Sequence, residues 1–123
     1  MMEIEVGIGE IVDKLSILMI KKEKITDPNK LKNIMKEFIY LDEIVKKLKI
    51  SDEDVSDFLS VNKKLWQVED DIREKERNKI FDKEFIELAR EVYITNDLRA
   101  EIKRKTNEKY SSDFIEEKSY SKY

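Results

Sequence analysis

Residues 11–20 read Ile-Val-Asp-Lys-Leu-Ser-Ile-Leu-Met-Ile, and seven of these ten side chains are apolar. At about 100° per residue, most of the apolar side chains in and around this stretch share one broad face of a helix. Ile17 and Ile20 fall on the opposite side of that helix. A helix that is apolar on two sides is typical of a central position or of a subunit interface. We therefore expect a central helix at residues 9–25, with Ile17 and Ile20 buried against another helix or a second subunit.

Three further helices are predicted by their capping residues. Asp27, Ser51 and Asp82 each stand where a side chain can accept a hydrogen bond from the first turn of a helix. Pro28 follows Asp27 at the first helical position, where its missing N–H costs nothing. Between these caps the apolar residues recur every three or four positions, as in helices that pack in a bundle. The predicted helices cover residues 28–48, 52–78 and 83–109.

The two ends of the chain have a different pattern. Apolar and polar residues alternate over residues 3–8, which predicts a short strand, and a strand needs a partner. The only other stretch that looks extended is 114–120, so we expect the termini to pair as a small β ribbon. The predicted fold is therefore all-α: a four-helix bundle-like single domain over residues 1–123, with a short β element formed by the termini.

The composition excludes several classes of chemistry. The chain of 123 residues has neither cysteine nor histidine, which removes disulfides, thiol chemistry and the commonest general base and metal ligand. No run approaches the roughly 20 apolar residues of a membrane span, and the N-terminus lacks the features of a secretory signal. Although 43% of the residues are charged, the net charge is only −3. We expect a cytoplasmic protein that binds no membrane.

Metal and nucleic-acid binding are not predicted either. Glu10 and Asp13, like Glu84 and Glu87, have the spacing of magnesium ligands in helical pyrophosphatases. With 28 acidic residues in the chain, such pairs arise by chance, so no metal and no cofactor is expected. Residues 96–110 hold five basic and three acidic side chains. This excess is too slight for a nucleic-acid interface in a chain that is acidic as a whole.

Polar side chains interrupt the apolar faces of two neighbouring predicted helices. They are Asn62, Glu69 and Arg73 in helix 52–78 and Asn96, Arg99 and Lys103 in helix 83–109. Burying such groups is costly unless each finds a partner, so we expect the two sets to come together. The cluster is either a structural network of ion pairs or a binding site. Because its cations outnumber Glu69, a site here would favour a carboxylate or a phosphate.

Two functions remain open from these residues. The leading prediction is a ligand- or partner-binding helical module whose cationic polar patch accepts an anionic group. The alternative is an enzyme acting on a small carboxylated or phosphorylated metabolite, with Glu69 as acid or base. An open pocket containing Arg73, Arg99 and Lys103 would favour ligand handling. A patch sealed by internal salt bridges would instead favour a scaffold or interaction protein.

The chain also resembles an uncharacterised bacterial family of short all-helical proteins, a domain of unknown function. Some of its members are associated with gene neighbourhoods for sugars or surface polysaccharides. The resemblance extends over nearly the whole chain, although the family brings no assigned reaction and no catalytic residues. It rests on Gly9-Glu10-Ile11-Val12-Asp13-Lys14-Leu15-Ser16-Ile17-Leu18, Lys24-Ile25-Thr26-Asp27-Pro28, residues 62–73 and 85–93, Asn96-Asp97-Leu98-Arg99-Ala100 and Glu116-Glu117-Lys118-Ser119-Tyr120.

A second likeness is to the helical chorismate mutases, in the logic of the site alone. These small intertwined all-α dimers hold a dianionic substrate with arginine, lysine, glutamate and amide side chains. Helix 9–25 contains no arginine, so their arginine-rich first-helix motif is absent here. From the second apolar side of helix 9–25 we expect a homodimer, and from the cationic cluster a small anionic ligand is a further possible partner.

Overall fold

The structure is a computed structural model that describes residues 2–111. Within these residues, four α-helices follow one another: α1 (Ile8–Lys24), α2 (Pro28–Lys47), α3 (Asp52–Arg77) and α4 (Lys83–Lys109). The all-α prediction is confirmed, and every helix boundary lies within one residue of the position expected from the sequence.

The predicted caps determine where the helices begin. Asp27 accepts hydrogen bonds from two backbone N–H groups of the first turn of α2, Ser51 accepts one at the start of α3, and Asp82 accepts one at the start of α4. Lys49 and Lys79, each with φ of 56°, turn the chain just after α2 and α3. Local chemistry alone therefore accounts for most of the helix boundaries.

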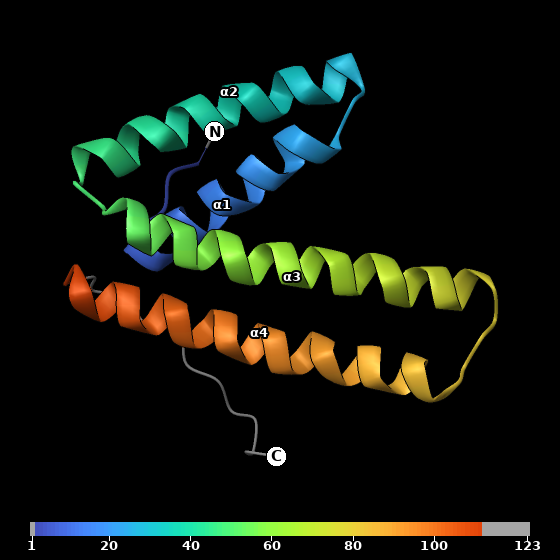
Figure 1. The fold of residues 1–123 in the computed structure, drawn as a ribbon. Helices are drawn as coiled ribbons and strands as arrows, with labels where there is room; N and C mark the ends of the chain where they lie inside the picture. The colour runs from blue at the N-terminus through green and yellow to red at the C-terminus, as the bar shows by residue number, and fades with distance from the viewer. Residues whose placement is uncertain (1, 112–123) are drawn as a thin grey trace.

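The helices form two antiparallel pairs with α1 between the others (Figure 1). α1 packs against each of the other three helices and α3 packs along α4, whereas the backbone of α2, among the described helices, comes close only to that of α1. The predicted central position of α1 is therefore confirmed. In Figure 1 α3 and α4 run on together beyond α1, as a two-helix arm that ends at the loop between them.

One apolar core joins the first three helices. Phe58 of α3 is completely buried and is the largest of the fully buried side chains. It packs in a cluster with Val12, Leu15, Leu18, Leu41, Val45 and Ile50. Ile20 is also buried, as predicted, although it lies on the other side of α1, and Ile17 is half-buried. A single chain thus covers much of the second apolar side of α1, and the homodimer stays a prediction.

The predicted strand at residues 3–8 is wrong. Residues 2–7 have no regular secondary structure, and Ile8 is already the first residue of α1. The side chains of Ile4 and Val6 are exposed. The alternation failed as a signal because a strand is stable only beside a partner. The expected partner, 114–120, lies outside the described residues.

Gly9 lets α1 approach α4 more closely than any other residue would. A Cβ atom added at Gly9 would lie 2.8 Å from the backbone oxygen of Lys103 and 3.1 Å from its Cα atom. The Gly9 backbone N–H also donates to Oδ1 of Asn107 at 2.7 Å. The first turn of α1 therefore rests directly on the backbone of α4.

This close approach predicts that Gly9→Ala destabilises the protein by about 2 kcal/mol, because backbone atoms must move apart to admit one methyl group. Urea unfolding followed by circular dichroism would measure the change in unfolding free energy. Lys14→Ala, at an exposed position of the same helix, is the control and should change stability by less than about 0.5 kcal/mol. If the Gly9→Ala protein is as stable as the wild type or more stable, α1 and α4 are not closely packed at this position.

Candidate functional site

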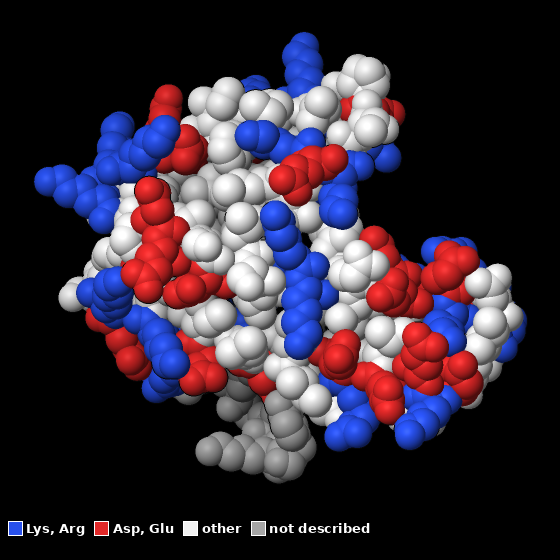
Figure 2. All heavy atoms as spheres, in the orientation of Figure 1, with Lys and Arg blue, Asp and Glu red and all other residues white. Residues whose placement is uncertain are grey.

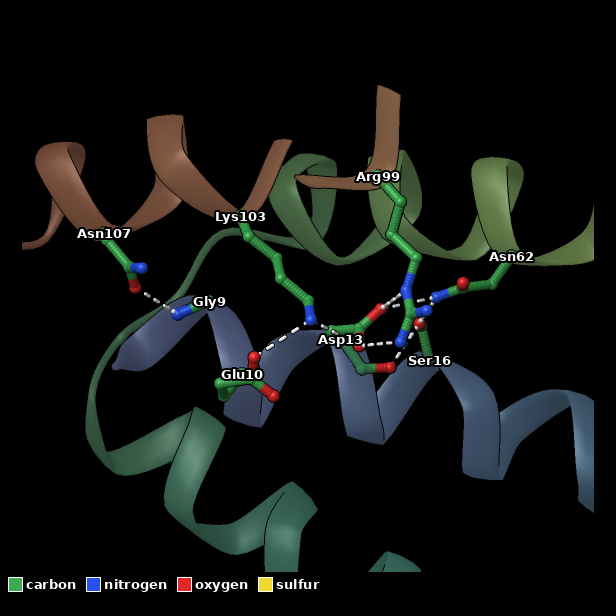
Figure 3. A network of polar contacts seen from close by, with 8 residues as sticks. All are labelled: Gly9, Glu10, Asp13, Ser16, Asn62, Arg99, Lys103 and Asn107. Carbon is green, nitrogen blue, oxygen red and sulfur yellow. Dashed lines mark hydrogen bonds and ion pairs between the residues drawn. The ribbon is translucent and has the colours of Figure 1, made fainter. Parts of the chain in front are cut away.

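A buried carboxylate, Asp13 of α1, is the centre of the polar cluster (Figure 3). The residue is only 2% exposed. Arg99 of α4 donates to both of its oxygens, from Nε to Oδ1 at 2.8 Å and from Nη2 to Oδ2 at 2.5 Å. Nζ of Lys103, one turn further along α4, lies 3.6 Å from Oδ2. Two cations of α4 therefore surround one acid of α1.

Two neutral side chains complete the coordination of Asp13. Nδ2 of Asn62, on α3, donates to Oδ1 of Asp13 at 2.9 Å and to Oγ of Ser16 at 2.7 Å. Oγ of Ser16 in turn donates to the backbone carbonyl of Asp13 at 2.7 Å. No buried side-chain nitrogen or oxygen among the described residues lacks a hydrogen-bond partner. The network thus joins α1, α3 and α4 with its polar groups satisfied.

Glu10 pairs with Lys103, the second cation of the network. Its Oε1 accepts from Nζ of Lys103 at 2.9 Å, at the more exposed edge of the network. Glu10 and Asp13 from α1 thus face Arg99 and Lys103 from α4, two acids against two bases. Opposite charges are therefore paired across the interface of α1 and α4, and removal of one partner would leave a buried charge uncompensated.

The pKa of Asp13 reflects this environment. Burial by itself would raise the pKa of this carboxyl group, since it disfavours the charged form. The hydrogen bonds from Arg99 and Asn62, together with the charges of Arg99 and Lys103, outweigh burial and hold the pKa below its ordinary value. Asp13 is therefore ionised at neutral pH and serves as the counter-ion of α4.

The structure divides the six predicted site residues into two groups. Asn62, Arg99 and Lys103 lie in the buried network. Glu69 and Arg73 form an exposed pair on α3, with Nε of Arg73 3.2 Å from Oε2 of Glu69. Among the described residues, no hydrogen bond or ion pair joins this pair to the network. Asn96 is half-buried on α4 and also lies outside the network.

The sequence reasoning missed the acids that neutralise the cations. From the sequence, Glu69 was the one acid expected beside Arg73, Arg99 and Lys103, whereas in the structure Arg99 and Lys103 are paired with acids of α1. A signal was present: positions 10, 13 and 16 of α1 recur every three residues and hold Glu, Asp and Ser. Three polar residues on one side of an otherwise apolar helix indicate a buried polar contact.

A groove opens beside the network, between α1 and the arm of α3 and α4. Its volume is about 340 Å³. Apolar side chains of α1 and α3 form one part of its wall: Ile17, Ile20, Leu65 and Trp66. Polar side chains form the rest: Asn62, Glu69, Asp70, Arg73 and Arg99. Part of the predicted cluster therefore lines an open cavity, although Lys103 does not.

A smaller groove of about 210 Å³ lies next to the first, lined by Ile20, Glu23, Lys24, Lys63, Trp66 and Gln67. Ile20 and Trp66 line both grooves, so the two cavities adjoin at these side chains. Figure 2 shows the molecule hollowed between the layer of α1 and α2 and the arm of α3 and α4. Charged side chains of both signs surround this hollow.

Neither a cluster of possible metal ligands nor a helix able to span a membrane is found within residues 2–111. Within residues 2–111, no group of three or more acidic side chains is placed to share a metal ion. Glu10 and Asp13 have magnesium-like spacing, yet they bind cationic side chains of α4. No helix in the same residues combines the length and apolar character that crossing a membrane requires.

Comparison of the chain with protein-family models, with curated proteins and with solved structures found no significant match. The resemblance noted from the sequence therefore stays a prediction, and the geometry of the site is what bears on function.

Proposed function

We propose that this chain is a ligand-binding module, and that its ligand combines an apolar body with an anionic group. The site is the groove of about 340 Å³ between α1 and the arm of α3 and α4. The observation that carries the proposal is that Arg73, whose side chain is exposed, lines the same cavity as the apolar side chains of Ile17, Leu65 and Trp66.

The groove is suited to a small molecule. Its volume falls within the roughly 300–1,000 Å³ that is usual for small-molecule sites, which are mostly apolar with a few polar groups to orient the ligand. Ile17, Leu65 and Trp66 are half-buried and present apolar surface to the cavity. An apolar ligand body that covers them gains the free energy of removing that surface from water.

Arg73 is the residue that we expect to bind the anionic group. Its side chain is 71% exposed, and its Nε atom donates to Glu69. The described residues supply no partner for its two terminal nitrogens, which can bind a carboxylate or a phosphate through paired hydrogen bonds. Arg99 is part of the same wall, but Asp13 engages it through two hydrogen bonds. We therefore assign the binding of the anionic group to Arg73 and a structural role to Arg99.

Trp66 makes the proposal directly testable. It is the single tryptophan of the chain and lines the groove. Decanoate, an apolar chain with one carboxylate, should change its fluorescence in a saturable way, and decanamide should bind more weakly. Arg73→Gln should weaken decanoate binding about tenfold, the effect of losing one charge-assisted hydrogen bond or more.

Arg77→Gln is the matched control, because Arg77 lies one turn further along α3 in an exposed pair with Glu74. It should leave the affinity for decanoate unchanged. A fluorescence response that is equal in wild type and Arg73→Gln would contradict the assignment of Arg73. A failure of decanoate to perturb Trp66 at all would contradict the groove as the binding site.

A further inference from the structure

We infer that the two adjoining grooves are a single elongated site, and that its ligand carries an anionic group at each end. This inference rests on the proposed function, since it extends the same groove. The observation behind it is that Ile20 and Trp66 line both cavities. A ligand whose apolar middle lies against these two side chains therefore has its two ends in different grooves.

The second groove contains cations that can receive the second anionic end. Lys24 of α1 and Lys63 of α3 face a single acid there, Glu23. The separation of 4.0 Å between Nζ of Lys63 and Oε2 of Glu23 is at the limit for an ion pair. Both of these side chains are more than half exposed, so the lysine can turn toward another anion at little cost.

The two cationic ends are suitably spaced along α3. Lys63 and Arg73 are ten residues apart, which corresponds to about 15 Å along a helix axis. Trp66 lies between them in the sequence and lines both cavities. An extended diacid with an aliphatic chain of about ten carbons can reach from one cation to the other when these long, flexible side chains are included.

The acids of the first groove favour such a separation of charge. Glu69 and Asp70 line the first groove together with Arg73. A second anionic group placed close to the first would lie near these carboxylates and be repelled. The ligand class that fits is therefore an elongated apolar molecule with anionic groups at its two ends, rather than one with two anionic groups at one end.

The test compares decanedioate with decanoate in the wild-type protein and in variants, with Trp66 fluorescence as the readout at low ionic strength. The diacid should bind about fivefold more tightly than the monoacid, as expected for one additional exposed ion pair. The double variant Lys24→Gln/Lys63→Gln should lose this preference and keep its affinity for decanoate. Arg73→Gln should weaken both ligands. Lys64→Gln, at the exposed position next to Lys63, is the control and should change neither affinity.

The outcomes separate this inference from the function on which it rests. If decanoate binds and decanedioate binds no more tightly, the two-ended site is overturned and the binding module stands. The same holds if the diacid preference survives in the Lys24→Gln/Lys63→Gln variant. If neither acid changes Trp66 fluorescence, the proposed function is overturned and this inference with it.

Discussion

Replacing Asp13 with asparagine is expected to reduce the free energy of unfolding by about 3–5 kcal/mol, the range for removing one partner of a buried ion pair. The change preserves the size of the side chain but removes the carboxylate that pairs with both Arg99 and Lys103. It also places an amide N–H₂ group where the wild-type protein has an acceptor for Asn62 or Arg99. Urea unfolding followed by circular dichroism would measure the loss.

Asp71→Asn is the matched control. Asp71 is an exposed acid of α3 that accepts a hydrogen bond from the side chain of Gln67. Its replacement should cost less than about 0.5 kcal/mol. If Asp13→Asn costs no more than this control, the buried network does not hold α1 on α4.

The same residue predicts a dependence of stability on pH. The pKa of Asp13 is lowered in the folded protein, whereas the pKa of an aspartate in an unfolded chain is about 3.9. The unfolded state therefore binds the proton more readily. The stabilisation is complete above the unfolded pKa and is lost as the pH falls through the lower folded pKa.

Other acids with lowered pKa values, such as Asp54 and Asp82, contribute in the same direction. The contribution of Asp13 is therefore the difference between the wild-type protein and Asp13→Asn. This difference should shrink as the pH falls below about 4. A difference that is constant from pH 7 to pH 3 would show that Asp13 does not carry the charge of the network.

The second large effect is expected for Arg99→Met. Methionine keeps the apolar part of the side chain, but it leaves the buried carboxylate of Asp13 with Lys103 at 3.6 Å and the amide of Asn62. We expect a loss of about 3 kcal/mol in the free energy of unfolding. Arg90→Met, at an exposed position of the same helix, is the control and should be close to neutral.

A double-mutant cycle identifies the origin of that loss. In the protein that carries both Asp13→Asn and Arg99→Met, neither charge remains to be stranded, so the combined loss should fall below the sum by about 1–3 kcal/mol. Additive losses would mean that the two residues act independently. A fully stable Arg99→Met protein would instead support the prediction from the sequence that Arg99 serves a ligand rather than the fold.

The helices were predictable from the sequence because their signals are local. Asp27, Ser51 and Asp82 each cap a helix through hydrogen bonds to residues two or three positions later. The apolar residues of α1 also indicated its central position, since a helix that is apolar on two sides needs neighbours on both. The strand predicted at residues 3–8 is not found, because local alternation cannot show whether a distant partner is present to stabilise a strand.

The sequence predicted which residues of α3 and α4 are buried at the site, but not the helix that packs against them. The sequence showed that Asn62, Arg99 and Lys103 lie on faces that must be buried, and the structure buries or half-buries them together. It did not show which helix covers those faces. α1 supplies Asp13 to Arg99, whereas Glu69 and Arg73 remain an exposed pair at the groove. Periodicity identifies the buried face of a helix but not the face that packs against it.

The ion pair between Asp13 and Arg99 also has a consequence for synthesis of the protein. Arg99 follows Asp13 by 86 residues, and Lys103 follows Glu10 by 93. At roughly 5–20 residues per second, the ribosome needs on the order of ten seconds to add this length of chain. During that time α1 has no access to Arg99 and Lys103. The buried polar network of the nascent chain can therefore form only after α4 has left the exit tunnel.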